Sequence, residues 1–153
     1  GGSASGLGIA TTTASTQLLG LWNAATSGTR HYVRFAIGAD GNEVGTITST
    51  GTTTAYNTSS DARLKDVTGS ARGLEVINEL NPVSYNWKAD GKADEGLIAQ
   101  EILDIVPNAV SGSEEDMYQM DYSKLVVHLV AGMKEQQAQI EALQSEINLL
   151  KGE

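Results

Sequence analysis

Few side chains in this sequence have the types and spacing that covalent chemistry needs. The chain has no Cys and only two His, His31 and His128, so a thiol nucleophile is excluded and we assign neither His a catalytic role. The hydroxyls of Ser59 and Ser60 come shortly before Lys65. A serine is a weak nucleophile until a base removes its proton, and Lys65 is the nearest candidate base. On residue types alone, this segment is more typical of a turn or helix cap followed by a solvated lysine.

A lysine acts as a base near neutral pH only if its pKa falls from about 10.4 toward 7, which takes roughly 4–5 kcal/mol of desolvation or nearby positive charge. Arg63 is a source of such charge, and burial at a subunit junction would supply desolvation. Asp61 and Asp66 both lie close enough in sequence to steer Lys65, and the sequence does not choose between them. We therefore expect any such activity to depend on assembly, because an unassembled chain leaves the lysine in water.

Composition argues against several other classes of function. The 153 residues carry a net charge of −9, which makes binding to nucleic acid phosphates improbable. The scarcity of His and the lack of Cys argue against a metal site, and we expect no cofactor. A glycosidase needs two placed carboxylates and a sugar-binding groove. Residues 1–60 offer only Asp40 and Glu43, so this function would require parts of the protein that are missing here. With no run of about 20 apolar residues and no signal-peptide pattern, no membrane span is expected.

The chain changes character near residue 60. Thirty of the first 60 residues are Gly, Ser or Thr, whereas 17 of the 19 acidic residues come later. Residues 1–15 contain little that could bury surface, and a short apolar patch follows at residues 18–22. Alternating residues 31–37 and 44–48 predict two strands around a turn at Asp40-Gly41, and the Thr-rich run to Tyr56 also has β character.

These strands cannot close a core within one chain. They suit a fibrous β-structure in which several chains share a narrow interior. The alternative is a flexible linker with one hairpin.

The remaining residues predict a small α+β unit. A helix is expected at 73–80, ended by Asn81-Pro82, followed by a strand at 83–87, a turn at 89–91 and an apolar run at 96–99. A second helix is expected at 100–106, stopped by Pro107, and short strands at Val110 and 117–120.

From residue 121 the pattern becomes a heptad repeat. Apolar residues alternate at spacings of three and four, with one polar position, at Val126, Leu129, Met133, Gln136, Ile140, Leu143, Ile147 and Leu150. This favours a coiled coil over a lone amphipathic helix. Asp121 or Ser123 would cap the helix start, and Gly152 follows its end. Ile and Leu alternating along the seam usually favour a dimer, but a larger assembly can override that preference.

Four segments in order resemble the peptidase S74 family, the C-terminal intramolecular chaperone of bacteriophage tail spikes, tail fibres and endosialidases. The first is Ser60-Asp61-x-Arg63-Leu64-Lys65. The others are Leu80-Asn81-Pro82-Val83-Ser84-Tyr85-Asn86-Trp87, then Gly96-Leu97-Ile98-Ala99-Gln100-Glu101 with Val106-Pro107, and finally Met120-Asp121-Tyr122-Ser123-Lys124-Leu125. The resemblance covers roughly residues 59–151.

The resemblance implies a specific organisation. Residues 1–60 would be the end of an intertwined triple-stranded β-fibre (a triple β-helix), and residues 61–153 the chaperone, with an α+β part at 61–120 and a coiled-coil helix at 121–151. The chain would be a homotrimer in a virion tail fibre, assembled in the host cytoplasm. Its partners would be its own copies and the fibre of the same polypeptide, while a host receptor or glycan would bind parts of the protein missing here.

The resemblance also implies that the domain releases itself by cutting Ser60–Asp61 as a serine peptidase with a Ser60–Lys65 dyad. Attack by Ser60 Oγ on its own carbonyl would form a four-membered ring. Attack by Ser60 of a neighbouring chain, attack by water, or a five-membered shift at Ser59–Ser60 all stay open. The alternative function is a structural trimerisation or receptor-contact tip that stays attached to the fibre.

Overall fold

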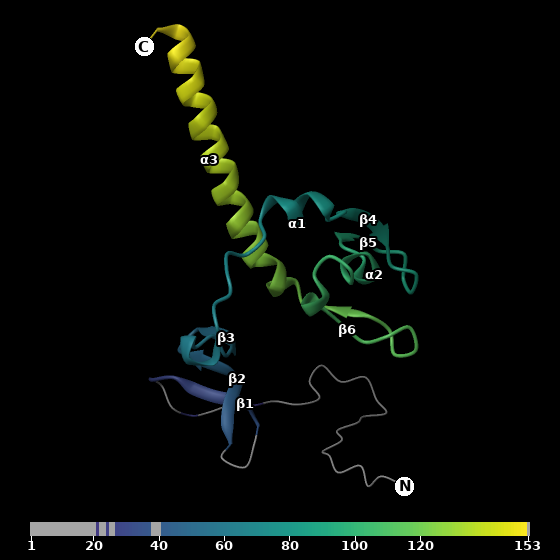
Figure 1. Cartoon of the computed structure of the whole chain (residues 1–153). Coiled ribbons are helices and arrows are strands. Elements are labelled where there is room, and N and C mark those ends of the chain that lie inside the picture. The colour runs from purple at the N-terminus through teal and green to yellow at the C-terminus, as the bar shows by residue number, and fades with distance from the viewer. Residues whose placement is uncertain (1–20, 22–23, 25–26, 38–40, 153) are drawn as a thin grey trace. The chain divides into compact units, whose positions relative to one another are not determined.

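The computed structural model describes residues 21, 24, 27–37 and 41–152. The chain divides into two compact units, Gly1–Val67 and Thr68–Glu153. Antiparallel sheets occur in both units and a long helix in the second (Figure 1), so the predicted α+β class is confirmed. The predictions for residues 1–15, for most of the apolar patch at 18–22 and for Asp40 lie outside the described residues.

The first unit contains a three-stranded antiparallel meander. Its strands are β1 (Arg30–Ile37), β2 (Asn42–Thr50) and β3 (Thr53–Thr58), in the order β1-β2-β3. The alternating and Thr-rich segments therefore form strands as predicted, because β-branched side chains fit a pleated surface. Gly51, with φ of +73°, lies in the tight turn between β2 and β3.

The two faces of this sheet differ in polarity. Val33, Ile47 and Tyr56 lie opposite one another across the three strands, and this apolar face stays largely open, with Phe35 53% and Tyr56 80% exposed. Alternate residues point to the opposite face. A single chain thus leaves apolar surface of this sheet uncovered by its described residues.

The opposite face carries a small polar network. Thr46 and Thr48 are buried there, and Asn57 Nδ2 donates to their hydroxyl oxygens at 3.2 and 3.1 Å. Hydrogen bonding between buried polar groups keeps their burial from being costly.

The second unit alternates short helices and hairpins. Helix α1 (Leu74–Glu79) leads to the hairpin of β4 (Val83–Asn86) and β5 (Ala93–Gly96), and then to α2 (Ala99–Ile102). The 3-10 turn η2 (Pro107–Ala109) precedes the pair β6 (Val110–Ser111) and β7 (Gln119–Met120). The 3-10 turn η3 (Tyr122–Leu125) then opens into α3 (Val126–Lys151).

Two elements differ from the sequence-based prediction. Helix α2 ends at Ile102, not at residue 106, because the backbone turns there and the amides of Ile105 and Val106 both bond to the Ile102 carbonyl. Strand β5 was not predicted, since Ala-Asp-Glu-Gly has little intrinsic β preference. It forms because the turn after Trp87 folds it back onto β4.

The core of the second unit is small and aliphatic. Its buried residues come from α1, α2, η2 and η3 and the segment between them, and they are Val76, Ile102, Val106, Ala109 and Leu125. Partly buried residues pack around this cluster, namely Leu80, Leu97, Ile105, Val110 and Met120. The unit therefore folds around contacts between residues that lie far apart in the sequence.

Helix α3 packs against α1 where glycine allows close approach. Gly132 is buried, and a Cβ at this position would lie 3.4 Å from both Ile77 Cγ1 and Leu74 N. The Glu135 carboxylate caps the start of α1 by accepting from Leu74 N at 2.7 Å. A Cβ on Gly73 would displace this carboxylate, so Gly73 leaves room for the cap that Glu135 provides.

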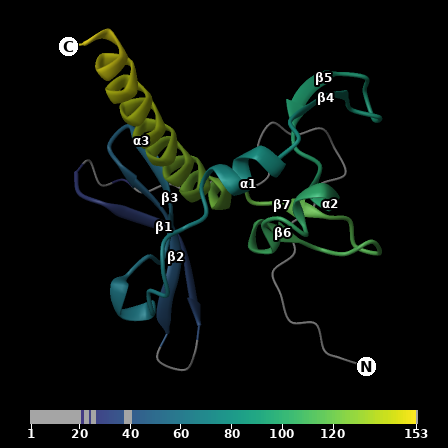
Figure 2. The same cartoon turned by 45° about the horizontal axis from the view of Figure 1, so that its top comes forward.

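The C-terminal half of α3 extends beyond the other elements of its unit (Figures 1 and 2). Residues 133–147 are all exposed within the described chain. The helix ends at Gly152, in the left-handed region with φ of +76°. At the other end, Asp121 accepts a hydrogen bond from Ser123 N and so caps η3. No helix in the described residues is long and apolar enough to cross a membrane.

Candidate functional site

The candidate site follows directly from the last strand of the sheet. The amide of Ser59 donates to the Val44 carbonyl at 3.1 Å, and its hydroxyl to the Glu43 carbonyl at 3.4 Å. Both contacts tie the residue before Ser60 to the start of β2. The chain therefore leaves the sheet at Ser60.

A 3-10 turn immediately follows, η1 (Ala62–Leu64), capped by Asp61. The Asp61 carboxylate accepts from Arg63 N at 2.8 Å, and the Asp61 carbonyl accepts from Leu64 N at 3.1 Å. Lys65 closes the turn by donating its amide to the Ala62 carbonyl, also at 3.1 Å, and then returns to extended backbone. Asp is a favoured residue at such a cap because its side chain satisfies an amide that has no partner in the helix.

The turn brings the lysine side chain back to the serine. Lys65 Nζ donates to Ser60 Oγ at 2.8 Å, and both residues are exposed. This distance is within the ordinary range of a strong hydrogen bond. The same contact, with a neutral amine accepting from the hydroxyl, is the geometry of a serine and its general base.

Arg63 is paired with Asp61. Its Nε and Nη2 donate to the two carboxylate oxygens of Asp61 at 3.0 and 2.7 Å, a bidentate ion pair. The side-chain bond from Arg63, followed by its backbone amide, lowers the pKa of Asp61 below its usual value against a small desolvation effect. The partner carboxylate raises the pKa of Arg63 in turn.

From the sequence, we expected Arg63 to supply positive charge near Lys65. The sequence did not decide whether Asp61 or Asp66 steers Lys65. In the structure, Asp61 bonds to Arg63, while Lys65 bonds to Ser60. The sequence feature that could have indicated the Asp61–Arg63 ion pair is an Asp two residues before an Arg at the start of a helical turn. Only the geometry of the turn shows that the two side chains meet.

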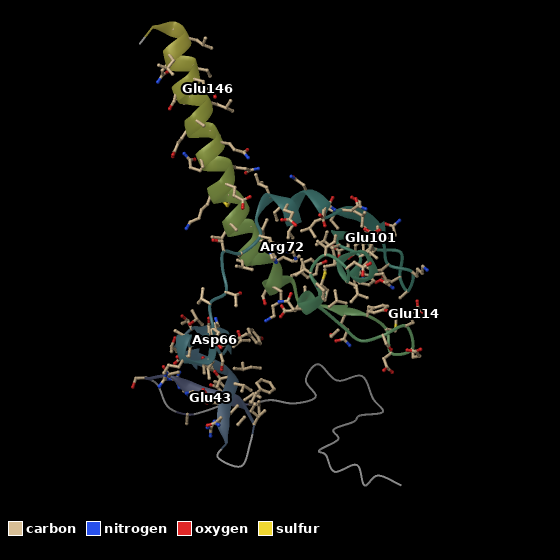
Figure 3. All side chains as sticks on the ribbon, in the orientation of Figure 1. Glu43, Asp66, Arg72, Glu101, Glu114 and Glu146 are labelled. Carbon is tan, nitrogen blue, oxygen red and sulfur yellow. The ribbon has the colours of Figure 1, made fainter. Side chains whose placement is uncertain are left out.

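A surface pocket lies beside the turn. It is lined by residues of β2 and of the junction, namely Glu43, Ser59, Asp61, Arg63 and Leu64. Glu43 is held at its edge by an ion pair with Arg34 of β1 at 3.0 Å. Asp66 follows the turn and is exposed (Figure 3).

The residues of the predicted seam all lie on α3 and are exposed in the single chain. Their exposed fractions run from 43% at Ile147 to 88% at Leu150 and include Val126, Leu129, Met133, Ile140 and Leu143. The contacts with α1 use a different face, formed by His128, Gly132 and Glu135. Packing within the second unit therefore leaves the heptad face free.

The two histidines lie outside the junction. His31 is on β1 and exposed. The Nδ1 atom of His128 lies 2.7 Å from the carbonyl oxygen of Arg72, where the chain enters α1 beside α3 (Figure 3). Arg72 Nη2 in turn donates to the Ile105 carbonyl at 2.7 Å. These contacts give His128 a role in holding α1 to α3.

A protein-family model matches part of this chain. The model of the peptidase S74 family, described as chaperone of endosialidase, matches residues 60–111, about a third of the chain. No curated protein matches the sequence significantly. The matched segment begins at Ser60, includes η1 and the core helices α1 and α2, and ends at β6. Over residues 60–111, the resemblance seen in the sequence is therefore confirmed, because this segment matches the model of the peptidase S74 family, the chaperone of endosialidase.

Proposed function

We propose that this chain is an intramolecular chaperone that assembles a β-rich phage tail fibre as a homotrimer and then releases itself by cutting its own backbone at Ser60–Asp61. The family match supports the chaperone role. The proposed client is the β-rich segment that precedes residue 61 in the same polypeptide. The proposed domain boundary is the scissile bond itself.

Two surfaces support self-association. The seam residues of α3 are exposed on a face that the rest of the second unit does not use. The sheet of the first unit also leaves apolar side chains such as Phe35 and Tyr56 open. Apolar surface of this kind is stabilised when other chains cover it. A parallel trimer would cover both surfaces, the first as a coiled coil and the second as an intertwined fibre.

The observation that carries the cleavage proposal is the 2.8 Å contact between Lys65 Nζ and Ser60 Oγ. In the proposed reaction, the neutral amine takes the hydroxyl proton and the oxygen attacks a carbonyl carbon. With attack by Ser60 of a neighbouring chain, the Ser60–Asp61 C–N bond breaks, and the Asp61 nitrogen takes the proton from the Lys65 ammonium. Water then hydrolyses the resulting ester, leaving residues 1–60 and 61–153.

Two other routes use the same pair of side chains. Lys65 can instead activate a water that attacks the Ser60–Asp61 carbonyl. Alternatively, Ser60 Oγ can attack the preceding carbonyl through a five-membered ring, which exchanges the Ser59–Ser60 amide for an ester that water then hydrolyses. The routes differ in their products. Water and the neighbouring serine both leave Asp61 as a new N-terminus, whereas the five-membered route leaves Ser60 there.

The second candidate function is a tip that stays attached to the fibre without cleavage. The exposure of Ser60 and Lys65 in the single chain favours it, because burial is one of the two effects that would activate the lysine as a base. Under the first proposal, assembly must desolvate the pair. The two functions therefore predict different masses for the chains of the assembled protein. Self-cleavage predicts two fragments, whereas an attached tip predicts the intact chain.

The test is intact mass spectrometry of the purified chain and of its Ser60→Ala variant. We expect the wild type to give two fragments and Ser60→Ala to give one species of 153 residues. Asp61→Ala is unsuitable as a control because it alters the turn, so Ser27→Ala, outside the strands, serves instead. An uncleaved wild type in its assembled form would favour the attached tip. Cleavage of Ser60→Ala at the wild-type rate would exclude Ser60 as the nucleophile.

A further inference from the structure

Lys65 reaches Ser60 only because the backbone between them is folded. Five residues in extended conformation span about 17 Å, which is much farther than a lysine side chain reaches. Yet Nζ lies 2.8 Å from Oγ. Whatever closes the turn at residues 61–65 therefore decides whether the two groups meet.

The turn is closed mainly by Asp61 and Arg63. The Asp61 carboxylate accepts hydrogen bonds from the backbone amide of Arg63 and from the Nε and Nη2 atoms of its guanidinium, so that one side chain fixes the turn from two directions. The remaining bonds are two backbone contacts of 3-10 type, Leu64 to Asp61 and Lys65 to Ala62. No side chain of the turn is buried. An exposed turn of three residues has little packing to hold it, so the side-chain bonds carry much of its preference.

We propose that Asp61 and Arg63 are positioning residues, and that their ion pair holds the turn that places Lys65 Nζ against Ser60 Oγ. The inference rests on the proposed self-cleavage and deepens it. Arg63 acts through geometry, not by pushing a proton off Lys65 with its charge. Its guanidinium is already engaged by the carboxylate of Asp61, which cancels most of its field at Lys65.

The same local arrangement occurs once more and supplies a matched control. In the β4–β5 turn, Asp90 accepts from the backbone amide of Lys92 at 3.1 Å and from its Nζ at 2.7 Å. This pair has the same spacing and is also exposed, but it belongs to the other unit. Lys92→Met thus removes an equivalent ion pair without touching the proposed site.

The experiment measures the cleavage rate against pH in the full-length chain for Arg63→Met, Asp61→Ala, the double variant and Lys92→Met. We expect each single variant to lower the plateau rate by on the order of 100-fold with an unchanged pH midpoint, because the base is misplaced and its own titration is not altered. The cleavage rate of the double variant should be no lower than that of the slower single variant, since the two residues act through one ion pair. Asp61→Asn should recover part of the loss, because its side-chain oxygen still caps the turn.

Other charged groups around the turn are Asp66 on the same segment, and Glu43 of β2 with its partner Arg34 of β1. They are unchanged in every variant, so a shift of the pH midpoint reports the loss of charge at Arg63 or Asp61. A rise of the midpoint in Arg63→Met with an unchanged plateau would overturn the inference in favour of a charge effect. Additive losses in the double variant would overturn it as well.

A second readout separates the inference from the cleavage proposal. The nuclear Overhauser effect between the Lys65 ε-methylene and Ser60 β-methylene protons reports their proximity in the uncleaved chain, before the proposed cut separates the two residues. We expect it in the wild type and in Lys92→Met, and its loss in Asp61→Ala. If the contact persists in Asp61→Ala, the positioning role is wrong. If the contact follows this pattern but Ser60→Ala does not alter cleavage, the proposed function fails and the positioning role stands.

Discussion

The junction at residues 60–65 and the core of the second unit are built in opposite ways. The junction consists of contacts between residues two to five positions apart, all of them exposed. The core joins Val76, Ile102 and Leu125, which are far apart in sequence and buried. Local, exposed contacts contribute little to the free energy of unfolding, whereas buried aliphatic contacts contribute most of it. The proposed chemistry and the stability of the fold therefore depend on different residues, and mutations can separate the two.

The strongest challenge to this separation comes from the seam. If cleavage needs assembly, the junction is not self-sufficient despite its local geometry. Ile140→Asp puts a charge into each copy of the proposed interface, and burying unpaired carboxylates is very unfavourable. We expect loss of the trimer at micromolar concentration, by sedimentation, together with loss of cleavage.

The matched control for the seam is Ala138→Asp, on the same helix and exposed but on the side of the helix opposite the heptad positions. It should leave both assembly and cleavage intact. A monomeric Ile140→Asp chain that cleaves at the wild-type rate would uncouple the two activities. A stable dimer in the wild type would support the preference of the Ile and Leu seam over the family analogy.

Substitution of Lys65 should have the next largest effect. Lys65 belongs to the junction, so its loss should change the cleavage rate and not the stability of the fold. Lys65→Ala should slow cleavage by about 10²–10⁴-fold, because it removes the proposed base. Lys65→Arg should be nearly as slow, since a guanidinium does not give up its proton near neutral pH. The melting temperature, measured by circular dichroism, should stay at that of Ser60→Ala in both variants, and a large drop would show that Lys65 is structural.

Substitutions in the core of the second unit should do the reverse and lower the stability of the fold. Ile102 is fully buried, and Ile102→Ala should destabilise the second unit by about 2–5 kcal/mol through lost burial and the cavity left behind. Urea unfolding in a Ser60→Ala background measures this without interference from cleavage. Val67→Ala is the control, since Val67 is 90% exposed and its truncation should change stability by less than about 0.5 kcal/mol. Equal losses in both variants would contradict the assignment of the core.

The smallest effect concerns the ionisation of Asp61. Its pKa is lowered chiefly by the side chain of Arg63, so the ion pair favours the turn above the ordinary carboxylate pKa of about 3.9 and is lost as the pH falls through the lowered value. Carbon-detected NMR should show Asp61 titrating below this ordinary value in the wild type and close to it in Arg63→Met. An identical titration in both proteins would show that the ion pair does not form in solution.

Sequence patterns predicted the elements whose signals are local. Alternation at 31–37 and 44–48 gave β1 and β2, and the heptad repeat predicted the helix that forms α3. The junction residues were also named in advance, and the contact between Ser60 and Lys65 joins two of them. Their catalytic roles and the seam stay predictions, because they concern reactions and partner chains.

The missed features depend on tertiary geometry. Strand β5 owes its existence to pairing with β4 and not to its own residues. The cap of α1 comes from Glu135, 61 positions away, and no local pattern points to it. At the junction, the side-chain donors of Arg63 lie on Asp61, and the expected effect of Arg63 on Lys65 stays a prediction. In each case a polar or weakly β-forming residue takes the partner that the fold supplies.

The division of α3 into a half that packs on α1 and a half that extends alone has a consequence for engineering. Gly132 and Glu135 secure the first half to the fold, whereas the core uses no residue beyond Leu125. The distal half of the helix thus lies outside that core. Under the proposed assembly through the seam, a helix of another oligomeric preference grafted after residue 139 would reset the number of chains, while the same small fold and the same junction would be carried over unchanged.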